Sequence, residues 1–215
     1  MYNKFVRVEF YFDPSCPFCW ITSRWLLRVS DKRNLSILWC PFSLALKNDE
    51  LITSQNKSEF SEIHKSSHRI LRVITAARTN GANVIDLYTA FGIAYHLGKE
   101  PYDDNLIKRV LKENNLPSEL IISADDTSLD EVLQQSISSA TDIVGQDVGV
   151  PIIIFQSTNG EKNGYFGPVL DSLPDTDEGL QLWDGLIKFA DNKHFYELKR
   201  SRSAGDPDVY STGKC

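Results

Sequence analysis

The sequence has no long apolar run, no excess of basic residues and no glycine-rich phosphate loop. No apolar stretch reaches the ~18 residues of a membrane-spanning helix, so we expect no membrane association. The 215 residues carry a formal net charge of −6, which argues against nucleic acid as a partner. No Gly-x-Gly-x-x-Gly fingerprint occurs, and we expect no bound cofactor. Small molecules and proteins remain as partners.

Cysteine is also scarce, and the four cysteines are unevenly placed. Cys16 and Cys19 form a Cys-x-x-Cys pair, whereas Cys40 and Cys215 lie far from each other and from any close histidine. A structural zinc site needs a second pair of ligands at suitable spacing, so we expect no metal. The chain leads from Met1 directly into an apolar segment without a signal-peptide pattern. We therefore expect a cytoplasmic protein, in which such a pair is more often catalytic than structural.

The Cys-x-x-Cys pair stands at a predicted strand-to-helix junction, directly after the β-branched and aromatic run Phe5–Phe12. Unpaired N–H groups and the helix dipole at a helix start stabilise an anion, so Cys16 is predicted to be the nucleophilic thiolate. Cys19, one helical turn on, faces the same side and can attack a mixed disulfide formed on Cys16. Pro17 suits the first helical turn, where a missing N–H costs little.

The order of the predicted elements indicates the fold. They are a strand at 5–12, a helix at 16–30, a strand at 35–40, five helices between 43 and 145, strands at 148–155 and 165–167, and a helix at 178–191. This order predicts an α/β protein, with a thioredoxin-like fold that is split by a large inserted α-helical subdomain. The predicted units are a discontinuous thioredoxin-like domain (1–42 and 146–198), the inserted subdomain (43–145) and a mobile tail (199–215).

Pro151 is the second feature that carries chemistry. A proline that opens an apolar strand removes a ladder hydrogen bond, so its place after Gly149 and Val150 predicts a fixed turn with a cis peptide. In a thioredoxin-type fold the loop before this strand lies beside the dithiol. There the N–H and C=O of Val150 can pair with the backbone of a thiol-containing substrate. The alternative is an ordinary proline at a sheet edge.

A few further residues have less distinctive patterns. Cys40 falls in the second apolar strand and is predicted to be a buried, inert thiol. His64 and His68 are four residues apart on one helix but lack the glutamate of a zinc protease, so we expect both to be solvated. Asp13 could tune Cys16 or help Ser15 cap the motif helix. A carboxylate this close would oppose ionisation of Cys16, so the capping role is favoured.

Longer motifs extend the dithiol pattern along nearly the whole chain. They are Phe12-Asp13-Pro14-x-Cys16-Pro17-x-Cys19-Trp20-Ile21-Thr22-Ser23-Arg24-Trp25, Leu87-Tyr88-Thr89-Ala90 with His96, Val144-Gly145-Gln146-Asp147-Val148-Gly149-x-Pro151, Phe166-Gly167-Pro168-Val169-Leu170, and Phe195-x-Glu197-Leu198-Lys199-Arg200. Together these motifs resemble the DsbA-like, mycothiol-dependent reductases and nitroreductases. They are more specific than a bare Cys-x-x-Cys pair.

The resemblance implies a thioredoxin fold with a helical insertion, a cytosolic setting and electrons from a low-molecular-weight thiol, with mycothiol as the co-substrate. The Cys16 thiolate would attack a small-molecule or protein disulfide, a mixed disulfide or a nitroaromatic electrophile. Cys19 would then resolve the adduct, and mycothiol would reduce the resulting disulfide. A homodimer stays open.

The resemblance also assigns expected roles around the dithiol. His96 occupies the position of a family histidine and would line the cleft over Cys16 as a donor or proton relay. Phe18 stands where the family usually has tryptophan, which preserves an aromatic wall but removes an indole donor. Trp20, directly after the motif, is either another wall of the substrate groove or a filler between the motif helix and the insertion.

Two other classes of function stay open. Kappa glutathione transferases and hydroxychromene-carboxylate isomerases share the inserted thioredoxin fold, but they normally have serine where Cys16 stands. A non-catalytic redox-sensing module, whose oxidation would alter a partner surface, is the other alternative.

Overall fold

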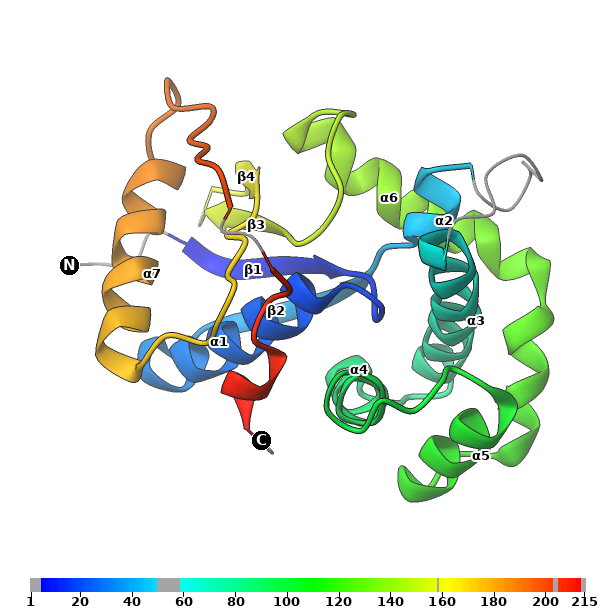
Figure 1. Ribbon diagram of the computed structural model, residues 1–215. Coiled ribbons are helices and arrows are strands. Elements are labelled where there is room, and N and C mark those ends of the chain that lie inside the picture. The colour runs from blue at the N-terminus through cyan, green and yellow to red at the C-terminus, as the bar shows by residue number, and fades with distance from the viewer. Residues whose placement is uncertain (1–4, 50–58, 158, 203–204, 214–215) are drawn as a thin grey trace.

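The computed structural model describes residues 5–49, 59–157, 159–202 and 205–213. A four-stranded sheet forms its centre, in the order β2-β1-β3-β4 (Figure 1). The strands are β1 (Phe5–Phe12), β2 (Ser36–Pro41), β3 (Ile152–Ser157) and β4 (Lys162–Phe166). β1 runs parallel to β2 and antiparallel to β3, and β4 pairs with β3 as a hairpin. The predicted βαβ unit and later hairpin are both confirmed.

Two helices cover one face of the sheet. They are α1 (Pro17–Arg33), which joins the parallel strands, and α7 (Thr176–Ala190), which follows the hairpin. The buried Trp183 of α7 packs against Trp25 of α1 and Phe155 of β3, at ring-centroid distances of 6.0 and 5.7 Å. The apolar positions of both helices therefore meet over the sheet, as their spacing predicts.

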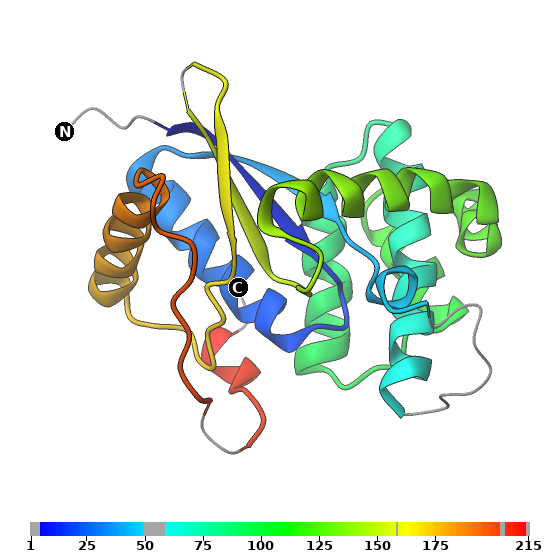
Figure 2. The ribbon, with the colours of Figure 1, turned by 90° about the horizontal axis from the view of Figure 1, so that it is seen from above.

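The insertion gathers beyond one side of the sheet (Figure 2, cyan to green). Its elements are α2 (Leu44–Lys47), α3 (Glu59–Thr79), α4 (Val84–Gly92), the π-helix η1 (Ile93–Leu97), α5 (Asp104–Glu113), the 3₁₀-helices η2 (Ser118–Asp125) and η3 (Thr127–Leu129), and α6 (Asp130–Val144). Helices α3 and α6 contact β2, and one cluster of buried apolar residues extends through the sheet and the insertion.

Three parts of the insertion differ from the predicted helices. The spacing of Val84, Leu87 and Tyr95 predicts one α-helix that ends at Gly98. The chain instead changes at Ile93 to a π-helix, in which the N–H of Gly98 bonds to the carbonyl of Ile93. Ser118, directly after Pro117, is a residue type that favours the N-cap of a short α-helix. The structure has a 3₁₀-helix there, with Pro117 at its N-cap. The single turn α2 has too few residues for any periodicity to show.

The chain after α7 returns to the sheet domain and ends near α1 (Figure 2, orange to red). A short 3₁₀-helix, η4 (Val209–Thr212), packs against α1 and η1. The N–H of Asp208 donates to the carbonyl of Asp171 at 2.7 Å. The mobility of residues 199–215 stays a prediction, but residues 205–213 make defined contacts. Cys215 lies outside the described residues.

Candidate active site

Cys16 stands at the N-cap of α1, with Pro17 as the first helical residue. Its Sγ accepts a hydrogen bond from the backbone N–H of Cys19 at 3.5 Å. It also lies 3.6 Å from the carbonyl oxygen of Val150, to which the thiol donates. Cys16 is partly exposed. A thiolate here gains a backbone donor and the positive end of the helix dipole, and it remains accessible to a substrate.

Cys19 lies one turn into α1 and is fully buried. Burial raises the pKa of Cys19 well above its ordinary value, and the neighbouring Cys16 raises it further. Both residues are free thiols in the structure. The accessible Cys16 is therefore placed to attack first, and the protected Cys19 is placed to attack the sulfur of Cys16 from inside the protein.

The peptide bond between Val150 and Pro151 is cis, which confirms the prediction for this turn. A second cis peptide, between Gly167 and Pro168, was not predicted. The two turns lie together, because the N–H of Gly167 donates to the carbonyl of Pro151 at 2.7 Å. The hydroxyl of Thr22 in α1 donates to the carbonyl of Pro168 at 2.9 Å. Both proline turns are thus held close to the motif helix.

Asp13 does not cap α1 as expected, because the N-cap position is taken by Cys16. Its fully buried carboxylate instead ties the loop before the dithiol to the insertion. Oδ1 accepts hydrogen bonds from the N–H and hydroxyl of Ser15 and from the hydroxyl of Ser67 in α3, and Oδ2 accepts one from the N–H of Leu44. A buried carboxylate is stable only with such donors.

The next residue in this loop, Pro14, is held by two more side chains from the insertion. Its carbonyl oxygen lies 2.8 Å from Nε2 of His96 and accepts a hydrogen bond from the Tyr102 hydroxyl at 2.8 Å. Burial lowers the pKa of His96 to about 4, so the ring is neutral near pH 7 and its Nε2–H donates to Pro14. In this arrangement His96 fixes the loop, and its Nε2–H is engaged away from the sulfur atoms.

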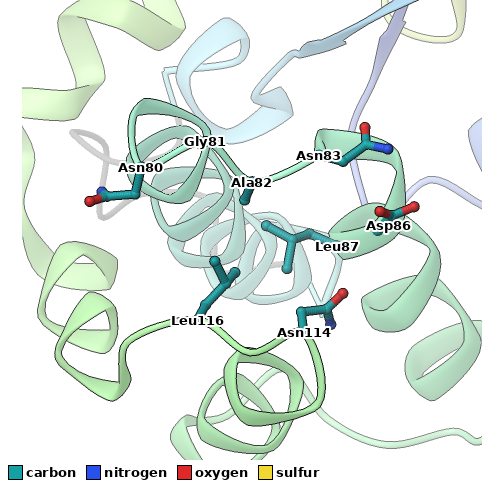
Figure 3. A pocket seen from close by; sticks show the side chains of 8 residues that line it. All are labelled: Asn80, Gly81, Ala82, Asn83, Asp86, Leu87, Asn114 and Leu116. Atoms are coloured by element: carbon teal, nitrogen blue, oxygen red, sulfur yellow. The ribbon is translucent and has the colours of Figure 1, made fainter.

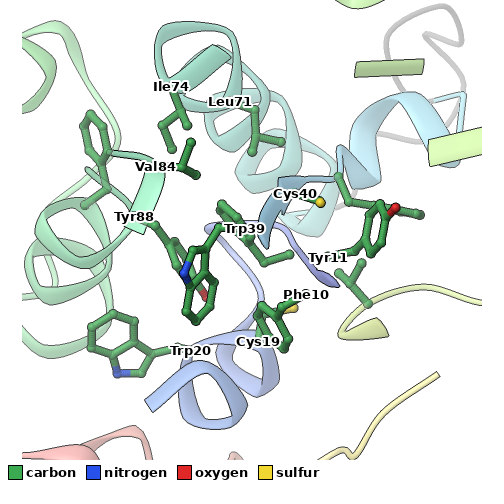
Figure 4. Packing of buried hydrophobic residues seen from close by; sticks show 14 of the residues in the cluster. Phe10, Tyr11, Cys19, Trp20, Trp39, Cys40, Leu71, Ile74, Val84 and Tyr88 are labelled. Atoms are coloured by element: carbon green, nitrogen blue, oxygen red, sulfur yellow. The ribbon is translucent and has the colours of Figure 1, made fainter. Parts of the chain in front are cut away.

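Trp20 is fully buried, so in this structure it is a filler between α1 and the insertion and not an exposed groove wall. Its ring stacks on His96, with the ring centroids 5.6 Å apart. It also meets Tyr88 edge-on, with the centroids 6.1 Å apart, and Figure 4 shows these two side chains. A Cβ at Gly92 would come within 2.3 Å of the ring, so only glycine fits there. The indole N–H donates to the hydroxyl of Thr212 at 3.1 Å.

Phe18, between the two cysteines, is partly exposed, and Arg202 from the C-terminal segment covers its ring. The Cζ atom of Arg202 lies 4.7 Å from the ring centroid. The aromatic wall expected at this position is therefore paired with a cation that lies 184 residues farther along the chain.

Several residues outside the dithiol loop take no part in this geometry. Cys40 is buried as predicted, and burial raises its pKa to about 12, which keeps it a thiol. His68 was predicted to be solvated, and this is wrong. It is buried, with Nδ1 2.9 Å from the Ser43 hydroxyl and Nε2 3.0 Å from Oδ1 of Asp130. Helical spacing showed which residues share a face, but it could not show that α2 and α6 cover it.

No group of metal-binding side chains stands out in the part of the chain that the structure describes. None of the described helices is long and apolar enough to cross a membrane. A hollow of about 240 Å³ lies in the insertion (Figure 3), but its lining includes no residue of the dithiol loop and no titratable group except Asp86. The lining residues are Asn80, Gly81, Ala82, Asn83, Asp86, Leu87, Asn114 and Leu116.

The sequence analysis missed Ser67, Tyr102, Thr212 and Arg202 at this site. Each contacts the dithiol segment across more than 50 residues of sequence, and no motif or spacing links it to Cys16. The sequence offered one indirect indication of these contacts, at Asp13. A carboxylate directly before the motif needs hydrogen-bond donors if it is buried, and Ser67 is one of them.

Comparison with known families and curated proteins agrees with this geometry. The family model described as "Rv2466c-like: Mycothiol-dependent nitroreductase Rv2466c" matches residues 15–200, which include the dithiol and both proline turns. The uncharacterized protein Rv2286c of Mycobacterium tuberculosis is 28% identical over 206 residues, covering 94% of this chain and 85% of the relative.

Solved structures support the fold. The cytosolic disulfide reductase DsbM from Pseudomonas aeruginosa superposes with a TM-score of 0.58 at 13% identity, covering 86% of this chain and all of that chain. A probable DsbA oxidoreductase, SCO1869 from Streptomyces coelicolor, has a TM-score of 0.54 at 15% identity, with 94% and 97% covered. The likeness shows the thioredoxin-like fold of DsbA-like proteins, as predicted.

Proposed function

Because the chain belongs to the Rv2466c-like family of mycothiol-dependent nitroreductases, we propose that Cys16 and Cys19 transfer electrons from mycothiol to disulfides, mixed disulfides or nitroaromatic compounds. The chain is a thiol–disulfide oxidoreductase, and the proposal concerns its donor, its acceptors and its setting. The observation that carries it is the partly exposed Cys16 Sγ, which lies at a helix N-cap beside the cis-proline turn, with a buried thiol one turn behind.

The proposed reaction with a disulfide has two steps. The Cys16 thiolate attacks one sulfur of the substrate, the S–S bond breaks, and one thiolate leaves. Cys19 then loses its proton to solvent and attacks Sγ of Cys16, which releases the second thiolate and leaves a Cys16–Cys19 disulfide. Two mycothiol molecules reduce this disulfide and become oxidised mycothiol disulfide. For a nitro compound, the same two electrons with two protons convert the nitro group to a nitroso group and water.

The residues around the dithiol support these steps in different ways. The N–H of Cys19 stabilises the attacking thiolate at Cys16, and Pro17 begins the helix that supplies the dipole. We propose that the main chain of Val150, held by cis-Pro151, aligns the substrate beside Cys16, and that Phe18 provides an aromatic surface. His96 and Trp20 act behind the dithiol, as positioning residues. The proposed setting is the cytoplasm, where mycothiol would be present as the reduced thiol that donates electrons.

Cysteine variants test the mechanism. We expect Cys16→Ser to abolish mycothiol-dependent turnover of a mycothiol mixed disulfide and of a nitroaromatic compound, because serine has no comparable anion at neutral pH. Cys19→Ser should accumulate a mixed disulfide on Cys16, which intact-protein mass spectrometry detects. Cys40→Ala is the matched control, since the buried Cys40 thiol should not contribute to turnover.

The same proteins test whether mycothiol is the thiol donor and whether the protein is an enzyme or a redox sensor. Glutathione in place of mycothiol should give much slower reduction of the Cys16–Cys19 disulfide. Undiminished turnover in Cys16→Ser would overturn the dithiol mechanism. No turnover with either thiol would favour the redox-sensing alternative over an enzyme that acts on these substrates.

A further inference from the structure

Arg202 differs from several other arginines of the chain in the way its charge is balanced. Four arginines form an ion pair with an aspartate or glutamate side chain: Arg33, Arg69, Arg72 and Arg109. Arg202 instead lies over the Phe18 ring, is exposed, and forms no ion pair among the residues that the structure describes. Because a guanidinium over a ring face makes no hydrogen bond to that ring, its five N–H donors can still bind an anion.

The position of Arg202 is set by contacts that do not involve its own side chain. The chain on either side is tied to the body of the protein by α7, which precedes it, and by η4, which follows it. In η4, the hydroxyl of Ser211 accepts from the N–H of Leu173, and that of Thr212 accepts from Trp20. The segment therefore lies against the motif helix at two points, where Arg202 covers Phe18 and where η4 contacts α1. Figure 1 shows η4 in red below α1.

The local charge favours an anion. The chain is acidic overall, with a net charge of −6, but Lys199-Arg200-Ser201-Arg202 brings three cations into four residues. A further cation, Lys99 of the insertion, has its Nζ 5.3 Å from the ring centroid of Tyr210 in η4. Stacking on an aromatic ring holds a guanidinium in place and leaves its donors in plane for a carboxylate.

We propose that Arg202, stacked on Phe18, is a specificity-determining residue that favours acceptor substrates with an anionic group next to the reacting disulfide. This inference rests on the proposed dithiol reaction and adds to it the charge of the preferred substrate. Arg202 binds the carboxylate of the substrate while the sulfur of the substrate meets Cys16. It takes no part in breaking or forming bonds.

Two aromatic disulfides of different charge test the proposal. The reduced enzyme, freed of reductant, is mixed in a stopped-flow instrument with the dianionic 5,5′-dithiobis(2-nitrobenzoate) or the neutral 4,4′-dithiodipyridine. Both follow the two steps given above, and both release thiols that absorption spectroscopy detects, one in the visible and one in the near ultraviolet. We expect Arg202→Ala to lower the second-order rate constant for the anionic disulfide by roughly three- to tenfold relative to the neutral one, the range of a partly screened ion pair.

Two further variants separate the effect of the Arg202 guanidinium over Phe18 from the effect of any positive charge in this segment. Arg200→Ala removes the same charge two residues away and should leave the ratio of the two rate constants within about twofold of wild type. Arg202→Lys keeps the charge but not the flat fork, and it should restore only part of the preference. Circular dichroism of each variant checks that the fold is retained.

Each possible result either supports or overturns the proposed role of Arg202. A ratio that stays unchanged in Arg202→Ala, whether both rate constants fall or neither does, overturns the specificity role, as does an equal change in Arg200→Ala. Failure of wild-type protein to reduce the neutral disulfide overturns the proposed dithiol function as well. Normal reduction of the neutral disulfide with an unchanged ratio overturns the role of Arg202 alone.

Discussion

The dithiol lies between two regions that hold it in different ways. On the side of the insertion, the loop residues Asp13 and Pro14 are buried and bonded to side chains from α3 and η1 and to Tyr102. On the side of the C-terminal segment, Arg202 and Tyr210 are exposed, and Thr212 provides a buried contact. The first region fixes where Cys16 stands, because buried polar networks have few alternative arrangements. The second is free to exchange its contacts for those of a substrate.

The largest expected loss of stability is in the region of the insertion, at Asp13. Asp13→Ala leaves the N–H of Leu44 and the hydroxyls of Ser15 and Ser67 without their buried acceptor. We expect a loss of roughly 3 to 5 kcal/mol in the free energy of unfolding, measured by urea denaturation. Ser67→Ala removes one donor and keeps the carboxylate, so it should cost about 1 kcal/mol. A loss below about 1 kcal/mol in Asp13→Ala would contradict the distinction between the two regions.

The next effect is a pH dependence of stability that comes from His96. In the folded protein the pKa of His96 is lowered to about 4 by burial, below the ordinary value of 6.5. As the pH falls from about 6.5 towards 4, the unfolded chain takes up a proton that the folded protein does not, so stability is lost in this window. The loss attributable to His96 between pH 7.5 and pH 5.0 should be roughly 2 kcal/mol.

The variant His96→Gln measures this contribution. Glutamine keeps a donor for the carbonyl of Pro14 but does not titrate, so the difference in unfolding free energy between the two pH values should shrink by roughly 2 kcal/mol. His68 adds a dependence of the same sign, since burial also lowers its pKa, and this part should remain. His194→Gln, at an exposed histidine, controls for the loss of an imidazole. An undiminished pH dependence in His96→Gln would show that His96 is not buried and neutral.

Local patterns predicted the order of the strands and helices in the sheet domain, but the strands expected at 148–155 and 165–167 lie at Ile152–Ser157 and Lys162–Phe166. The strand at 5–12 matches β1 residue for residue, because alternating β-branched and aromatic residues end at the proline turn before the dithiol. The helix start at Cys16 and the cis turn at Pro151 follow from the chemistry of single residues, and both are confirmed. These features are determined by neighbours within a few positions.

The environment of the dithiol could not be predicted in the same way. Whether Trp20 lies exposed or buried depends on Gly92, 72 residues on, which lets its ring approach the α4 backbone. His68 and Asp13 are likewise buried by elements that are distant in sequence. Contacts of this kind depend on how the insertion packs on the sheet domain, which periodicity within one helix does not contain.

The smallest expected effect is at Thr212, and it tests how firmly the C-terminal segment is held. Thr212→Val keeps the shape of the side chain but removes the acceptor for the buried Trp20 indole, so we expect a loss of about 1 kcal/mol in unfolding free energy. Thr212→Ser keeps the hydroxyl and should lose less. If Thr212→Val is as destabilising as Asp13→Ala, the segment is as integral to the fold as the insertion. A loss near 1 kcal/mol, together with weaker discrimination between the anionic and neutral disulfides, would instead show that η4 holds Arg202 over Phe18 without holding the dithiol itself.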